Sequence, residues 1–389
     1  MMSGSTRISA LEHVRFGVRR DRGLLPWPNP LKQFPSGLPD VLYEIDALAD
    51  RLPKYLYDGS IRMRLLRLPL VSLEKLEGSL LDLAFRHYSF FTSAYAWADC
   101  VKNLDAVHAA VIPYTLAIPF AAMAKKIGVP PILAYFMYAM HNFSVIDPAK
   151  PIQFDNLHLL QHFTIPPYDR DEDGFILPHV EIEAKAAPGL RAIPDAQHGA
   201  RVGDKEEFIY ALWQMESSLR AMARVLAAIP LVCSPEVYYR HIRPWIFYFR
   251  DIHYEGVGHF PVLKGETGAE SSSILSFDHA LSIHHEPTGL TDHLHELKSY
   301  RPSKQARWLR AIERGPSLRK FARKYRNDSH ICGAFNAVHE ALIDFRETHY
   351  KNALTYIKAK GRGDVATGGT HYEMFLTQLV RETRENMIV

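Results

Sequence analysis

The chain has 389 residues, more than a single hydrophobic core usually organises, so two domains are expected. Hydrophobic residues make up 47% of the sequence and charged residues 23%, a balance typical of a globular protein in water. The net charge is only +3, and no basic run is interleaved with aromatic residues. These features argue against a nucleic-acid partner.

The number and spacing of the cysteines, together with the lengths of the apolar runs, indicate the cellular compartment of the protein. The three cysteines are widely spaced and odd in number, which fits a reducing environment better than a disulfide framework. The first 20 residues lack the apolar core of a signal peptide. The longest apolar run, residues 109–124, contains two prolines and is shorter than the ~20 residues that cross a bilayer. We therefore expect a cytoplasmic protein with no membrane partner.

The first half of the chain alternates proline-rich and helical segments. Residues 24–39 contain five prolines, which predicts an extended segment. Helices are expected near 40–57 and 72–101. Prolines and acidic residues return over 146–178, which marks a candidate linker or domain boundary.

Beyond residue 200 the pattern is persistently helical. Between Asp204, a plausible N-cap, and Pro230, expected to close the helix, apolar residues are spaced alternately four and three apart. That spacing predicts one buried stripe, made of Phe208, Leu212, Met215, Leu219, Met222, Leu226 and Ile229. No series of strands and turns is visible, so the C-terminal half is expected to be all-α.

The stretch DRDEDGFILPHVE, residues 169–181, alternates aspartates ahead of a glycine like a calcium-binding loop. If Asp169 were the first ligand, the twelfth position would be Val180, and Glu181 would come one residue too late for bidentate coordination. We therefore interpret the acidic run as a solvated loop. Two histidine clusters, HLLQH (158–162) and HHEPTGLTDHLHE (284–296), lack a complete zinc motif and are expected to be surface or helix-end histidines.

The last long helix carries a histidine in an apolar position. Its stripe runs through Phe335, Val338, Leu342 and Phe345 to His349. A histidine on a buried stripe is more often a hydrogen-bonded core residue than a ligand. Arg346, one turn earlier, favours the ligand interpretation, because a buried arginine needs an anion. A heme would provide iron for the imidazole and a propionate for the guanidinium.

Residues 358–375 contain four glycines between two expected helices. The stretch has neither the preceding strand nor the Gly-Lys-Ser/Thr end of a phosphate loop. It is either a flexible connector or a lid over a ligand.

Collinear motifs over nearly the whole chain resemble the indoleamine 2,3-dioxygenase family. The resemblance is specific because many short motifs match in the same order along the chain. They are PWPNPL, AYAWAD (94–99), VPPILAY (129–135), YYRHIR (238–243), GAESSSILSFD (268–278), YRPSKQARWL (300–309), LIDFRETHYKNALTYI (342–357) and ATGGT (366–370).

The resemblance implies a fold and a cofactor. The expected fold is mainly α, with a small, mostly helical N-terminal domain (1–160) covering the distal side of a heme and a large all-α catalytic domain (161–389). His349 matches the proximal ligand of the iron in heme b. Arg346 matches the arginine that pairs with a propionate, assisted by Asp278.

The resemblance also implies a substrate site. Arg243 matches the arginine that holds the substrate carboxylate, which a guanidinium can grip with two hydrogen bonds. Thr367 matches the threonine of the lid, expected over 361–370. The remaining expected substrate-binding residues are Tyr135, Tyr138, Ala139, Phe175, Tyr238, Tyr239 and Gly268.

One distal position differs from the mammalian pattern. Without gaps, His179 falls where the mammalian enzymes carry a serine, whereas a two-residue shift would place Leu177 there. If His179 faces the heme, it resembles the histidine of tryptophan 2,3-dioxygenase that receives the indole N–H. The alternative is an ordinary polar residue at a helix start after Pro178. Tyr138 replaces a smaller cysteine, and with the tyrosines at 238 and 239 it predicts a more polar, narrower pocket.

The expected activity is insertion of O2 across the indole C2–C3 bond of L-tryptophan or a related indoleamine, giving N-formylkynurenine. His179, Arg243 and Thr367 are the expected catalytic residues, and an external reductant is needed only to reach ferrous heme. Two alternatives stay open. One is a heme monooxygenase of an aromatic substrate in secondary metabolism, and the other is an oxygen-binding protein without turnover, against which the carboxylate clamp and ATGGT argue.

Overall fold

The structure is a computed structural model that describes residues 15–358 and 365–389. Two of the predictions concern residues that lie partly outside these ranges. Most of the segment without a signal-peptide core, and residues 361–364 of the expected lid, lie outside the described residues.

The first part of the chain forms short helices around one long buried helix. Residues 24–39 contain no regular helix, as their prolines predict. The helix expected over 40–57 is interrupted at Arg51, and the one expected over 72–101 begins only at Ser79. The elements are α2 (Asp40–Asp50), α3 (Leu52–Tyr57), α4 (Ile61–Leu65), α5 (Ser79–Trp97), η1 (Ala98–Val101), β1 (Val111–Ile112) and α6 (Tyr114–Ile127).

The acidic stretch 169–181 is helical, which corrects the prediction of a solvated loop. It lies in α7 (Asp169–Lys185), which begins inside the expected linker 146–178 and continues through Pro178. Acidic residues occupy its first turn, where the positive end of the helix dipole favours them. Before it come η2 (Phe136–Met140), β2 (Phe143–Val145), η3 (Phe154–Asn156) and β3 (Leu157–Leu159).

One of these acidic residues, Glu172, is a buried hydrogen-bond acceptor. Its carboxylate accepts from the Tyr138 hydroxyl at 2.7 Å, from the Phe163 N–H at 3.0 Å and from the Thr164 hydroxyl at 2.6 Å. A fully buried carboxylate with several donors fixes the chain around it. Glu172 therefore ties the start of α7 to η2 and to the segment after β3.

Helix α9 (Lys205–Val232) confirms the predicted stripe. All seven of its predicted core residues are buried. Asp204 is the N-cap, because its side chain accepts from the Glu207 N–H at 2.9 Å. The helix ends at Val232 rather than at Pro230, because the Leu226 carbonyl that Pro230 cannot reach accepts instead from the Asn352 side-chain amide at 2.8 Å.

The C-terminal half is not purely helical. It contains a hairpin of β4 (Phe249–Tyr254) and β5 (Gly258–Leu263), and β1 pairs in parallel with β4 through Val111↔His253 and Ile112↔Tyr254. The helical elements are α8 (Ala187–Val202), α10 (Pro235–Val237), η4 (Tyr238–Ile242), η5 (Arg243–Ile246), η6 (Gly268–Glu270), α11 (Ser272–Leu281), α12 (Gly289–Glu296), η7 (Leu297–Tyr300), α13 (Ser303–Glu313), α14 (Leu318–Lys324), α15 (Ser329–Tyr356) and α16 (Tyr372–Glu385).

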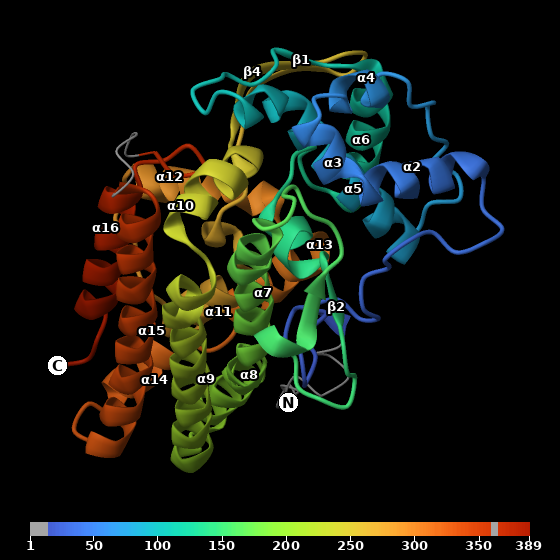
Figure 1. Ribbon diagram of the computed structural model, residues 1–389. Helices are drawn as coiled ribbons and strands as arrows, with labels where there is room; N and C mark the ends of the chain where they lie inside the picture. The colour runs from blue at the N-terminus through green and yellow to red at the C-terminus, as the bar shows by residue number, and fades with distance from the viewer. Residues whose placement is uncertain (1–14, 359–364) are drawn as a thin grey trace.

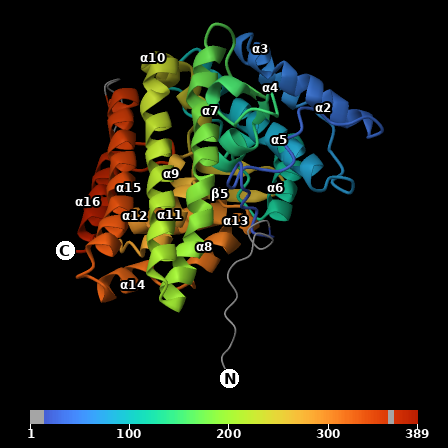
Figure 2. The ribbon, with the colours of Figure 1, turned by 90° about the horizontal axis from the view of Figure 1, so that it is seen from below.

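The fold is mainly α, as expected. Helices α7, α9, α15 and α16 lie side by side, while α2 to α6 gather at the other end of the molecule (Figures 1 and 2). Helix α9 is packed between α15 on one side and α7 and α8 on the other. A Cβ on Gly174 would lie 2.0 Å from the Val232 carbonyl oxygen, so glycine is required where α7 approaches the end of α9. The division at residue 160 stays a prediction.

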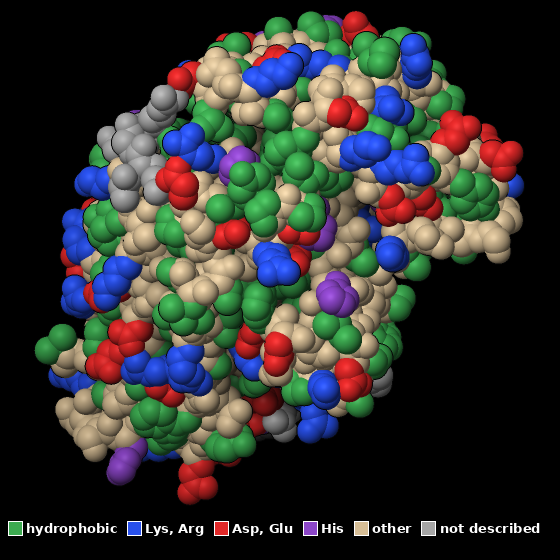
Figure 3. All heavy atoms as spheres, in the orientation of Figure 1, with side chains coloured by type: hydrophobic (Ala, Val, Ile, Leu, Met, Phe, Trp, Pro, Cys, Tyr) green, Lys and Arg blue, Asp and Glu red, His purple; other side chains and the backbone are tan. Residues whose placement is uncertain are grey.

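Basic and acidic side chains are intermixed on the face shown in Figure 3. No single helix among the described residues is long and apolar enough to cross a membrane. By length and composition alone, α9 together with residues 235–246 would pass as a pair bent by 84°.

Candidate active site

A mostly apolar cavity lies among α7, α9, α11, α12, α15, α16 and two loops. Its residues come from separate parts of the chain, from Tyr135 to Leu379. Of the residues predicted for the site, the cavity is lined by Tyr135, Phe175, His179, Tyr238, Gly268, Asp278, Arg346, His349 and Thr367. The structure therefore brings together most of the predicted residues.

His349 faces this cavity from α15. Its imidazole makes no hydrogen bond within the described part of the chain. Burial, with a smaller effect of the nearby His179 imidazole, lowers the pKa of His349 to about 4. The side chain is thus a neutral imidazole with a free lone pair, which is the form that binds a metal.

Arg346 and Asp278 form a buried ion pair in the wall of the cavity. Arg346 Nη2 lies 2.6 Å from Asp278 Oδ1 and 2.7 Å from Oδ2, and Nη1 contacts the Thr383 hydroxyl. The sequence predicts that Arg346 needs an anion, and Asp278 provides one within the chain. Both side chains border the cavity, so a second anion could join the pair.

His179, rather than Leu177, faces the cavity. Leu177 is buried away from it, and His179 lies in the middle of α7 rather than at a helix start. His179 Nδ1 is 2.6 Å from the Phe175 carbonyl oxygen. Since a carbonyl only accepts, Nδ1 carries the proton and Nε2 presents its lone pair. Burial lowers the pKa of His179, which keeps the ring neutral.

Aromatic rings form the wall near His179. The Phe175 ring centroid lies 5.0 Å from that of His179 and 4.5 Å from that of Tyr238. Tyr135 stands edge-on to His179 at 6.1 Å, and its hydroxyl donates to Glu183 at 3.0 Å. These rings leave room for a flat aromatic ligand beside the imidazole.

The structure does not bring Tyr138 and Ala139 into the lining of the cavity. Both are fully buried in η2. The Tyr138 hydroxyl donates its hydrogen bond to the Glu172 carboxylate at 2.7 Å, so it is not available to a ligand in the cavity. The polarity expected from this tyrosine therefore does not reach the cavity.

The ATGGT sequence forms an ordered turn. The Ala366 N–H donates to the Thr370 carbonyl at 2.8 Å, and the Thr367 carbonyl accepts from the Tyr248 N–H at 2.9 Å. The Thr367 hydroxyl donates to the Glu266 carbonyl at 2.5 Å. The turn is thus held against the loop that carries Gly268, and both loops line the cavity.

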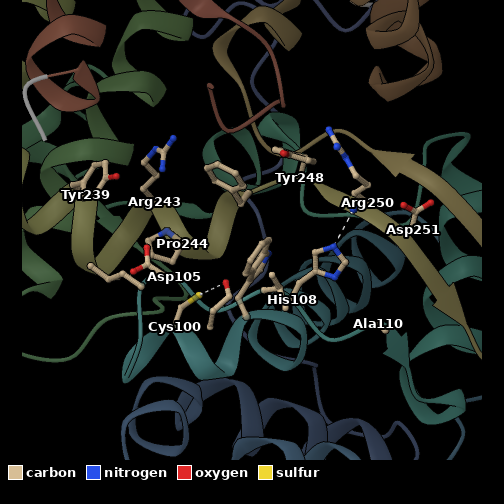
Figure 4. A pocket seen from close by; sticks show the side chains of 15 residues that line it. Cys100, Asp105, His108, Ala110, Tyr239, Arg243, Pro244, Tyr248, Arg250 and Asp251 are labelled. Carbon is tan, nitrogen blue, oxygen red and sulfur yellow. Dashed lines mark hydrogen bonds between the residues drawn. The ribbon is translucent and has the colours of Figure 1, made fainter. Parts of the chain in front are cut away.

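Arg243 and Tyr239 line a second, adjacent cavity (Figure 4). Arg243 Nη2 donates to the Val365 carbonyl at 2.7 Å, while its buried Nε has no hydrogen-bond partner among the described residues. The guanidinium lies 4.5 Å from the Phe247 ring and 5.2 Å from the Tyr239 ring. Burial lowers the pKa of Arg243.

The histidine clusters have different surroundings. His162 bonds to Asp173 at 2.9 Å and His285 to Glu382 at 2.6 Å. His293 lies in the last turn of α12, as the helix-end interpretation predicts, but it is buried and lines the main cavity rather than the surface. No three His, Cys, Asp or Glu side chains are grouped for a metal ion within residues 15–358 and 365–389.

Sequence reasoning missed Glu266. It lies in the loop between β5 and η6, is 5% exposed and lines the main cavity. Burial raises the pKa of its carboxyl to about 8. The available signal is an acidic residue in the glycine- and serine-rich run GETGAESSS, two residues before the family-like motif begins.

The structure is mainly α-helical, and its cavity is lined by neutral imidazoles from three different helices, α7, α12 and α15. The sequence model of the indoleamine 2,3-dioxygenase family matches residues 12–386. The chain belongs to this family, and it is accordingly an oxidoreductase of the dioxygenase type.

The chain is similar to relatives over nearly its whole length. It is 28% identical to indoleamine 2,3-dioxygenase 2 of Mus musculus, over 96% of this chain and 95% of the relative. It is 27% identical to indoleamine 2,3-dioxygenase 1 of the same species, over 99% and 97%. A 6-hydroxytryptophan 2,3-dioxygenase of Fusarium equiseti is 24% identical, over 91% and 86%.

Proposed function

We propose that the protein is a heme-dependent dioxygenase that inserts both atoms of O2 across the indole C2–C3 bond of L-tryptophan or a related indoleamine, giving N-formylkynurenine. The observation that carries this proposal is the pair His349 and His179 in one cavity, each neutral and each with a lone pair to offer. Family membership supplies the reaction class.

The residues present fit heme b. His349 would hold the iron, because its imidazole is neutral and unpartnered within the described chain. Arg346, already paired with Asp278, would stand beside a propionate. The apolar remainder of the lining suits a porphyrin. When bound, heme supplies the activation of O2, the cosubstrate.

The chain's own residues would bind and orient the substrate. The rings of Phe175 and Tyr238 would hold the indole, and His179 Nε2 would accept its N–H. Arg243 would grip the carboxylate, for which its guanidinium must turn from the neighbouring cavity. The turn with Thr367 would exclude water.

The reaction needs few partners. Insertion of both oxygen atoms consumes no net electrons, so an external reductant is required only to bring the iron to the ferrous state. The relative from Fusarium equiseti, named for 6-hydroxytryptophan, shows that substituted indoles occur among the substrates of related enzymes. L-Tryptophan is our leading substrate, and we propose no nucleic-acid or membrane partner.

The proposal predicts that His349→Ala abolishes stoichiometric heme binding, because the substitution removes the proposed ligand of the iron. Heme titration followed by the absorbance of the bound cofactor measures this. His330→Ala, an exposed position on the same helix, is the matched control and should bind heme like the wild type. Unchanged heme binding by a folded His349→Ala protein would contradict the assignment.

A further inference from the structure

Glu266 is held in place by its backbone. Its N–H donates to the Ile246 carbonyl at 3.1 Å, and its carbonyl accepts from the Thr367 hydroxyl at 2.5 Å. A Cβ on the preceding residue, Gly265, would lie 2.3 Å from the Ile246 carbonyl oxygen and 2.5 Å from that of Thr367. The close contacts on both sides fix where the Glu266 side chain emerges.

The carboxyl of Glu266 has no partner in the described part of the chain. Other buried carboxyls do: Glu183 accepts from Tyr135 and two serines, and Glu270 accepts from the Tyr135 N–H at 2.7 Å. Burying an ionisable group without a hydrogen bond is costly. A group that lines a ligand cavity, is 95% buried and lacks a partner is suited to an incoming ligand.

The groups close enough to Glu266 for its charge to affect their titration are the Glu270 carboxyl and the phenols of Tyr135, Tyr138 and Tyr238. None of them is a cation. Burial therefore raises the pKa of Glu266 to about 8, so that without a ligand the carboxyl is mostly protonated at pH 7.

Arg243 and Glu266 contact the same turn, because Arg243 Nη2 donates to the Val365 carbonyl at 2.7 Å and the Glu266 carbonyl accepts from the Thr367 hydroxyl at 2.5 Å. The pKa of Tyr238 is raised mainly by burial, while the Arg243 charge lowers it and the Glu266 charge raises it. Both groups are thus close to the same aromatic ring, one cationic and one acidic. An aromatic α-amino acid presents the complementary set: a ring, a carboxylate and an ammonium.

We propose that Glu266 is a specificity-determining residue that binds the α-ammonium group of the amino-acid substrate. This rests on the proposed function, since it assigns a second charge contact to the same site. On binding, the Glu266 carboxylic acid loses its proton to solvent and the carboxylate pairs with the ammonium, which keeps its own three protons. The pair replaces a neutral acid that had no partner.

Calorimetry of the heme-loaded protein without reductant tests the proposal with two ligands. L-Tryptophan and indole-3-propionate share the ring and the carboxylate, but only the first has the ammonium. Glu266→Gln should weaken L-tryptophan binding about 10- to 100-fold and leave indole-3-propionate unchanged. Glu313→Gln, the same change at an exposed carboxyl on α13 that does not line the cavity, is the control and should bind both ligands like the wild type.

A second readout is proton release. At pH 7 the wild type should release about one proton per L-tryptophan bound, measured in buffers of different ionisation enthalpy, and Glu266→Gln should release none. Equal L-tryptophan affinity in the wild type and in Glu266→Gln, or an equal loss for both ligands, would overturn the inference and leave the proposed function standing. If the wild type binds neither ligand, the proposed function falls, and the role of Glu266 with it.

Discussion

The histidines of this chain differ in whether they have partners. His87 and His162 bond to aspartates, whereas His349 has no hydrogen bond in the described structure and faces a cavity. The first arrangement is typical of a structural histidine, and the second is typical of a histidine that coordinates a metal. The helical stripe predicts the position of His349, but only the folded chain shows that Asp278 already satisfies Arg346.

His179 should determine whether the site accepts an N-methylated indole. Its Nε2 lone pair can accept the indole N–H, because Nδ1 is committed to the Phe175 carbonyl. Wild-type enzyme is expected to bind L-tryptophan about 5- to 10-fold more tightly than 1-methyl-L-tryptophan, and His179→Ala should lose this preference. Dissociation constants from optical titration of the heme measure it. The same preference in both proteins would exclude His179 as the acceptor.

At the scale of elements, helices with a regular apolar stripe could be predicted and those without one could not. The spacing in α9 and α15 identified their buried residues, since the period of 3.6 is set by the backbone itself. Helix α7 was missed because its acidic first turn resembles a loop and Pro178 suggested an end. The short strands of the β4–β5 hairpin have too little alternation to be seen.

The stability of the structure around helix α7 should depend on the buried carboxylate of Glu172. Replacing Glu172 with alanine leaves the buried donors of Tyr138, Phe163 and Thr164 without their acceptor. We expect a loss of about 3 kcal/mol or more in the free energy of unfolding, measured by urea denaturation.

The matched control is Asp169→Ala, at the partly exposed first residue of the same helix, which should cost no more than about 1 kcal/mol. A similar small cost for Glu172→Ala would mean that the buried network contributes little to α7.

At the scale of the whole molecule, the site is assembled from residues far apart in sequence. Helix α7, the loop at 266–271, α15 and the turn at 366–370 meet only after folding, and β1 joins the N-terminal part to the C-terminal hairpin. No local pattern contains that information. Most of the residues that the family resemblance suggested line the cavity, but the resemblance could not show that Tyr138 is directed toward Glu172, or that Glu266 enters the cavity without a partner.

The contribution of Glu266 to the free energy of unfolding should depend on pH. Its folded pKa of about 8 lies above the unfolded value of 4.5, so the folded state binds more protons and loses stability as the pH rises between these values. In heme-free protein, Glu266→Gln should become more stable relative to the wild type by about 2–4 kcal/mol from pH 5 to pH 8.

The control for this experiment is Glu313→Gln, at an exposed position on α13, for which the difference from wild type should stay constant with pH. Denaturant unfolding at several pH values provides the data. His349 acts in the opposite sense, because its lowered pKa of about 4 removes stability as the pH falls below 6.5. A flat difference for Glu266→Gln would mean that the carboxyl is solvated in the folded protein.

The most direct test of the central claim is mass spectrometry of the product formed when the heme-loaded, chemically reduced protein receives L-tryptophan under ¹⁸O₂. We expect a single product, N-formylkynurenine, that contains two labelled oxygen atoms. A product with a single labelled atom would contradict it in favour of monooxygenation. Unchanged L-tryptophan, despite normal oxygen binding, would contradict it in favour of another substrate or of oxygen binding alone.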